Sequence, residues 1–128
     1  MGQPAAKKGD KITANDMHMI QPPGTAPPVL TPHSFSGEID GNLSPDVKIE
    51  GAAAAFVGST ATNKPSHVPS GGTFVNPPAN KGTIKAGSQT VKINGKAAAR
   101  SGDTAETCND PADAPVGTVE ASGTVSIG

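Results

Sequence analysis

Apolar and polar residues alternate in three segments of the chain, and this pattern predicts paired β-strands. In the first segment the apolar positions are Ile39, Val47 and Ile49, and the other two segments repeat this order with Ile or Val at each place. Glycine beside Asn or Ser lies between the apolar runs, where a bend is expected. A period of two with a turn signal in between is typical of a β-hairpin. The three segments are residues 37–50, 82–94 and 117–127.

The hairpin segments lead into an alanine-rich unit that is itself repeated. Residues 47–59 match residues 91–103 without a gap, and a shortened copy at residues 2–10 lacks the preceding strand. The chain starts inside one repeat and ends with the hairpin that completes it. We therefore expect the termini to lie near each other and three repeats to close round an axis. The alanine runs, about four residues long, are too short for a stable isolated helix, and we interpret them as close packing near that axis.

This pattern predicts a single, mostly β domain over residues 1–128, with little helix, and the repeats leave no room for an appended domain. The arm at residues 19–36 contains five prolines, which exclude a helix and a paired strand, so we predict an extended, rigid loop there. The repeat cores and the closing hairpin are expected at about residues 2–18, 37–67, 82–108 and 117–127.

Composition limits what can hold such a fold together. The chain has no Trp, no Tyr and three Phe, so a large aromatic core is excluded. Its ten Lys and Arg are scattered without interleaved aromatics, which argues against nucleic-acid binding. One Cys cannot form a disulfide within the chain. No apolar run of signal-peptide length is present, so we expect synthesis in the cytoplasm and export by another route. Packing, hydrogen bonds or a metal must stabilise the fold.

The three His and the one Cys fall at related places in the repeats. His18 and His67 each follow the Gly-Asp or Gly-Ser corner of a repeat by eight residues, and Cys108 follows it by five. A pseudo-threefold axis would make these side chains converge, and His33 on the proline-rich arm could cross over the axis. Three imidazoles and one thiolate suit Zn²⁺, with Fe²⁺ as the alternative. We therefore predict a metal site formed by His18, His33, His67 and Cys108.

Four protein ligands leave no open coordination position, so the predicted site is structural. A structural Zn²⁺ contributes on the order of 10 kcal/mol that is realised on folding. The alternative is an enzyme: a small metalloenzyme could use the same ligands, with one of them labile. Asp10 and Asp103 are explained as turn residues, and Lys96 and Arg100 fit no phosphate-binding loop. No catalytic or cofactor-binding residue is predicted.

Two alanine-rich units resemble the Pro-Ala-Ala-Arg motif of PAAR-repeat proteins. They are Pro4-Ala5-Ala6-Lys7 with Gly9-Asp10, and Ala97-Ala98-Ala99-Arg100 with Gly102-Asp103 after Ile93-Asn94-Gly95. The resemblance covers nearly the whole chain, because the hairpin units also recur in that family. Position 7 is Lys, position 97 is Ala, and the middle copy has lost both the Arg and the Asp. These departures leave the roles of Lys7 and Arg100 open.

The resemblance implies a conical monomer on the blunt end of a trimeric β-helical spike. That spike is the valine–glycine-repeat protein of type VI secretion or its relatives in phage tails and extracellular contractile particles. Family members bind a metal near the apex through His and Cys, in agreement with the four ligands above. The implied function is a structural tip that pierces the target envelope, touches its membrane transiently and is delivered outside or into the target cell. The arms at residues 19–36 and 68–81 are candidate docking surfaces for separate effectors. A β-rich adhesin or decoration module is a further alternative.

Overall fold

The computed structural model describes residues 2–128, and Met1, the first residue of the predicted domain, lies outside the described residues. All regular structure in that part of the chain is β. No helix long and apolar enough to cross a membrane is found there. The strands in chain order are β1 (Gln3–Pro4), β2 (Lys11–Gln21), β3 (Val29–Gly41), β4 (Lys48–Ile49), β5 (Ala52–Ala53), β6 (Thr60–Asn63), β7 (Thr73–Phe74), β8 (Lys81–Ile84), β9 (Lys92–Ile93), β10 (Lys96–Ala97), β11 (Thr104–Thr107), β12 (Ala114–Glu120) and β13 (Ser126–Ile127).

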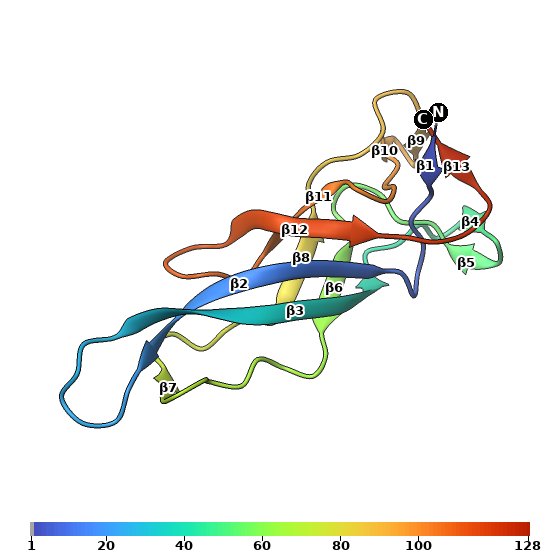
Figure 1. Ribbon diagram of the computed structural model, residues 1–128. Helices are drawn as coiled ribbons and strands as arrows, with labels where there is room; N and C mark the ends of the chain where they lie inside the picture. The colour runs from blue at the N-terminus through green and yellow to red at the C-terminus, as the bar shows by residue number, and fades with distance from the viewer. Residues whose placement is uncertain (1) are drawn as a thin grey trace.

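Six of these strands form a closed antiparallel barrel. β2 pairs with β3, β3 with β6, β6 with β8, β8 with β11, β11 with β12, and β12 returns to β2. The molecule tapers along the barrel: both chain ends lie at the wide end, and the loop between β2 and β3 lies at the narrow end (Figure 1). The predicted mostly β domain closed round an axis is confirmed.

Three short strand pairs at the wide end carry the sequence repeat. β4 pairs with β5, and β9 pairs with β10. Each pair is joined by a two-residue turn with positive φ at both positions, +51° and +84° at Glu50-Gly51 and +53° and +81° at Asn94-Gly95. Such turns match the twist of the flanking strands. The third pair, β1 with β13, has the same register but is made from the two ends of the chain. The predicted proximity of the termini is confirmed.

Ala6, Ala55 and Ala99 form a closed ring of backbone hydrogen bonds between the repeats. Ala6 N donates to Ala99 O at 2.9 Å, Ala99 N to Ala55 O at 3.1 Å, and Ala55 N to Ala6 O at 3.0 Å. All three side chains are fully buried. Three backbones that approach within hydrogen-bonding distance leave room only for small side chains. The prediction that the alanine runs pack closely near the axis is confirmed.

The barrel interior is filled by apolar side chains from all six of its strands. Ile12, Ile39, Ile84 and Val119 have no exposed surface, and Phe35 packs with them. Burial of such side chains is the main favourable contribution to folding. This core fixes the strands that continue toward the narrow end, where polar side chains replace the apolar ones.

The prediction of a loop at residues 19–36 is wrong over much of its length. Only residues 22–28 connect the strands, because β2 and β3 run on as one antiparallel hairpin. Pro32 fits inside β3 because it lies opposite Met17, whose N–H points away from β3 to Asn109 Oδ1 at 2.7 Å. Met17 and Pro32 thus form a pair without backbone hydrogen bonds between the two strands. Pro32 therefore turns its ring nitrogen to the outer edge of the strand, where a missing N–H has no cost.

The predicted hairpins were assigned the wrong strand partners. Residues 37–41 pair with β2 and β6 and do not turn back onto residues 47–49. The equivalent residues of β8 and β12 also pair within the barrel. The turn of each hairpin lies later in the repeat, between β4 and β5 and between β9 and β10. The alternation of apolar residues marked the strands correctly, but each strand pairs with its two neighbours in the barrel and not with the second apolar run of its own segment.

Candidate metal centre

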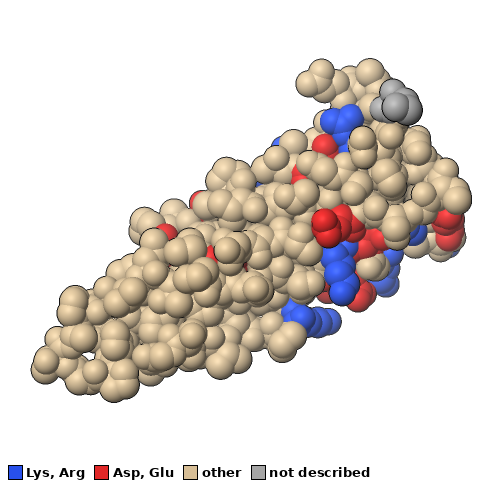
Figure 2. All heavy atoms as spheres, viewed as in Figure 1, with Lys and Arg blue, Asp and Glu red and all other residues tan. Residues whose placement is uncertain are grey.

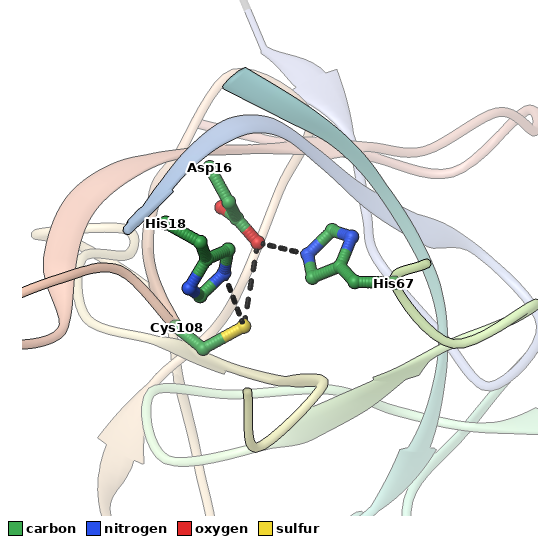
Figure 3. A group of neighbouring side chains, drawn as sticks. All are labelled: Asp16, His18, His67 and Cys108. Atoms are coloured by element: carbon green, nitrogen blue, oxygen red, sulfur yellow. Dashed lines mark hydrogen bonds and ion pairs between the residues drawn. The ribbon is translucent and has the colours of Figure 1, made fainter. Parts of the chain in front are cut away.

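Four polar side chains meet inside the barrel, next to the apolar core (Figure 3). Asp16, His18, His67 and Cys108 are buried, and one ligand atom from each lies within 4.8 Å of the others. Asp16 and His18 come from β2, Cys108 follows β11 directly, and His67 lies between β6 and β7. Imidazole, thiolate and carboxylate are all ligands of first-row divalent metals. The cluster could hold a metal ion.

The alternation of β2 explains why this strand supplies two donors. Asp16 and His18 are two residues apart, so both face the same side of the strand. That side is the inner one, because Ile12 and Ile20 in the same register are also buried. Asp16 was missed in the sequence analysis, which took the residues before His18 only as a lead to it. An acidic residue at an inward position of a strand, two places from a predicted ligand, was the available signal.

Asp16 accepts hydrogen bonds at both carboxylate oxygens. Oδ2 accepts from His67 Nε2 at 2.8 Å and from Cys108 Sγ at 3.4 Å. Oδ1 accepts from Thr107 Oγ1 and, at 3.4 Å, from Asn109 Nδ2. Asp16 has no exposed surface, so these donors replace the water that a buried carboxylate loses.

Burial changes the protonation of two of the donors. Desolvation lowers the pKa of His18, and the charge of His67 adds to this, against the Asp110 and Asp16 carboxylates that raise it. Desolvation, followed by the charge of Asp16, raises the pKa of the Cys108 thiol to about 11. Near pH 7 the His18 imidazole is therefore neutral and the thiol is protonated. A metal that binds here must displace the thiol proton.

His33 faces the cluster from β3 but lies outside the tight group of four. Its ring centroid is 5.7 Å from that of His18 and 5.6 Å from that of His67. Nδ1 of His33 donates to the Thr31 carbonyl at 2.9 Å, which leaves a lone pair on Nε2. That Nε2 is buried and has no hydrogen-bond partner among residues 2–128. A backbone carbonyl often orients a ligating His in this way. The structure thus brings the four sequence-predicted residues side by side and adds Asp16.

Comparison with protein families gives one match. The model of the PAAR motif matches residues 29–106 and 76–128, two overlapping segments that cover most of the chain. The chain belongs to the PAAR-motif family. Membership implies a structural role at the spike tip of a contractile injection system, and the PAAR family is structural rather than catalytic. A comparison with curated proteins found no match.

The charged residues of the PAAR motif lie at the start of β2 and β11, before these strands reach the metal centre. Lys7 Nζ lies 3.3 Å from Asp10 Oδ2, and Arg100 Nε lies 3.0 Å from Asp103 Oδ1. Each Asp also accepts a hydrogen bond from the backbone N–H of its basic partner, at 3.0 and 2.8 Å. The PAAR pairs therefore close the corner turns that lead into the barrel.

Proposed function

We propose that this protein is the metal-stapled tip that caps and sharpens the trimeric β-helical spike of a contractile injection machine. The partner would be a spike of the valine–glycine-repeat type or its phage homologue, with one copy of this chain on each trimer. The main support for the proposal is that the three repeats present equivalent side chains at the wide end.

The wide end presents two sets of equivalent aliphatic side chains, one from each repeat. The inner set is almost buried and the outer set is exposed to nearly the same extent in all three repeats. Solvent alone gives no reason for exposed valines at three matching positions, whereas a threefold partner would cover each of them in the same way. The inner set is Ile49, Ile93 and Ile127, each 7% exposed, and the outer set is Val47, Val91 and Val125, 37%, 37% and 41% exposed.

His18, His33, His67 and Cys108 are the proposed protein ligands of one structural metal ion, Zn²⁺ with Fe²⁺ as the alternative. The unpartnered Nε2 of His33 and the borderline-to-soft donor set support this assignment. When bound, the ion would cross-link β2, β3, the segment between β6 and β7, and the end of β11, with on the order of 10 kcal/mol of binding energy coupled to folding. The staple would stiffen the narrow end beyond the apolar core. No catalytic role is proposed.

The composition of the narrow end supports transient contact with a target membrane. Residues 17–37 and 65–80, which build most of this end, contain no Lys, Arg, Asp or Glu. Asp110 from the β11–β12 connection packs against them, and its side chain is nearly buried. Figure 2 shows the charged side chains of the visible face gathered mainly toward the wide end. Exposed aliphatic residues are present instead, including Val29, Leu30 and Val68. Because ionised groups are costly to bring into hydrocarbon, a tip with few of them on its surface is better suited to piercing an envelope.

The proposed tip role also implies where effectors would bind and where the protein would be found. The arms at residues 19–36 and 68–81 would dock separate effectors, and residues 2–128 would act as one tip domain. The protein would be made in the cytoplasm, assembled at the tip of the particle and delivered with it.

The decisive experiment is reconstitution with a purified trimeric spike. Size-exclusion chromatography with light scattering should show one copy of this chain on each trimer. A charge at the wide end, as in Val91→Asp, should weaken the complex at least about tenfold, because a carboxylate would be buried without a partner. The matched control is Val116→Asp on β12, where the valine is 48% exposed and lies on the side of the barrel.

Val116→Asp should bind the spike like the unchanged protein. Equal binding by Val91→Asp and Val116→Asp would contradict docking through the wide end. Replacement of exposed aliphatic residues of the arms, as in Leu30→Ser with Val68→Ser, offers a separate test that keeps the strands and His33. Delivery of an effector that survives both changes would argue against the docking role of the arms.

A further inference from the structure

Asp16 lies among the proposed metal ligands without being one of them, and the geometry points to Asp16 Oδ2 as a direct ligand of the metal. This inference rests on the metal site proposed above. The carboxylate is completely buried, and its Oδ2 lies 2.8 Å from His67 Nε2 and 3.4 Å from Cys108 Sγ. Figure 3 shows Oδ2 pointing into the space that the other three side chains share.

The first argument is the supply of hydrogen bonds to Asp16. Oδ1 accepts from Thr107 and Asn109, which are not proposed ligands. Within the described part of the chain, Oδ2 accepts only from His67 and Cys108. A thiol that binds a metal loses its proton, and an imidazole nitrogen that binds a metal has no proton to donate. Metal binding by those two residues would therefore remove both donors from Oδ2.

A buried carboxylate oxygen without a donor is strongly unfavourable. The metal ion itself is the positive group in reach that can replace the lost donors. The displaced thiol proton leaves to solvent, and the carboxylate oxygen takes a place in the coordination shell. Asp16 and the Cys108 thiolate together would then balance the two positive charges of the ion in a site that excludes water.

The second argument is the position of the proton on His67. Ser36 N–H donates to Asn63 Oδ1 at 2.9 Å, which turns Asn63 Nδ2 toward His67 Nδ1 at 3.3 Å. Nδ1 therefore accepts, and Nε2 carries the proton that is donated to Asp16. Binding of the metal by His67 through Nε2 therefore requires this proton to leave Nε2. If the proton moves, Oδ2 loses a donor as described above. Oδ2, which lies within the group of clustered ligand atoms, then has the metal as its new partner.

The test uses Co²⁺ as a spectroscopic probe in the metal-free, full-length protein. The unchanged protein should show a thiolate-to-cobalt charge-transfer band and visible ligand-field bands. Asp16→Asn should keep the charge-transfer band, shift the ligand-field bands and weaken Co²⁺ binding at least about tenfold. The matched control is Asp110→Asn. Asp110 Oδ2 lies 3.7 Å from His18 Nδ1 but is not one of the clustered ligand atoms, so this change should leave the band positions as they are.

Identical ligand-field bands in Asp16→Asn and the unchanged protein would overturn the inference, even if affinity falls, because Asp16 would then only position other ligands. Absence of the thiolate band in the unchanged protein would instead contradict the metal site itself. If Asp16→Asn does not fold, X-ray absorption at the metal edge of the unchanged protein decides the question. An oxygen scatterer in addition to imidazole nitrogen and one sulfur supports Asp16 as a ligand, and a shell of imidazole and sulfur alone excludes it.

Discussion

Ser59 Oγ accepts a hydrogen bond from the backbone N–H of Phe56 at 3.0 Å. Asp103 Oδ2 accepts the equivalent bond from Arg100 N at 2.8 Å in the next repeat. The middle repeat therefore keeps the geometry of the corner although it has lost both the acid and the base. The hydrogen bond from the backbone N–H to the side chain closes the corner in both repeats. The ion pair between Arg100 and Asp103 is present only in the later of these two repeats and is not needed to form the turn.

Ser59→Ala should lower the free energy of unfolding by about 1–3 kcal/mol, the usual cost of leaving a buried polar group without a partner. Ser59 has no exposed surface, and its hydroxyl also donates to Asn42 O at 2.9 Å. Urea unfolding followed by circular dichroism measures the change. Ser70→Ala, at an exposed serine, should stay within about 0.5 kcal/mol of the unchanged protein. A similar small effect at Ser59 would show that the corner needs no side-chain acceptor.

Removal of the metal should lower the melting temperature, because four segments lose a shared cross-link. His67→Ala and Cys108→Ser should each lower metal content and melting temperature together, as elemental analysis and calorimetry would show. The metal-free protein should keep its barrel, since the apolar core around Ile12 and Phe35 is formed mainly by side chains other than the donors, with Cys108 as the exception. Unchanged metal stoichiometry in both variants would rule out these residues as ligands.

The apparent affinity for Zn²⁺ should rise about tenfold per pH unit between about pH 7 and 9. The pKa of Cys108 is raised to about 11, so the metal-free thiol is protonated over this range and releases its proton on binding. A reaction that releases a proton is favoured by higher pH. The pKa of His18 is lowered, so its imidazole is already neutral above pH 7 and contributes no further proton.

Competition with a chromophoric chelator, corrected for the chelator's own protonation, measures this slope. Cys108→Ser should bind more weakly and with a flatter dependence on pH, because no thiol proton is released. A flat profile in the unchanged protein would mean that the thiol is not a ligand.

Pro32→Thr should increase self-association. Pro32 lies on the outer edge of β3, beyond the residues that pair with β6, and a new N–H there would offer the edge to a strand from another molecule. Light scattering at increasing protein concentration measures the effect. Pro28→Thr, in the connecting loop, is the control and should leave association unchanged. Equal scattering by both variants would show that other features protect this edge.

The sequence alone determined the repeat, the corners after its alanine runs and most of the proposed ligands. These features are local, or they recur at a fixed spacing: Gly9-Asp10 and Gly102-Asp103 form corners in which the glycine has positive φ, and the alanine runs show where chains must pack closely. His18, His67 and Cys108 could be found because each follows the same corner of a repeat.

Only the tertiary structure decided which strands pair and which residues complete the centre. β3, β8 and β12 each pair with two neighbouring strands of the barrel. Closing a barrel satisfies more backbone groups than three separate hairpins would. Pro32 could be placed in a strand only once the opposite residue, Met17, was known to point away. Asp16 joined the centre because β2 turns its side chain inward, and no spacing along the chain reveals which donors it will meet there.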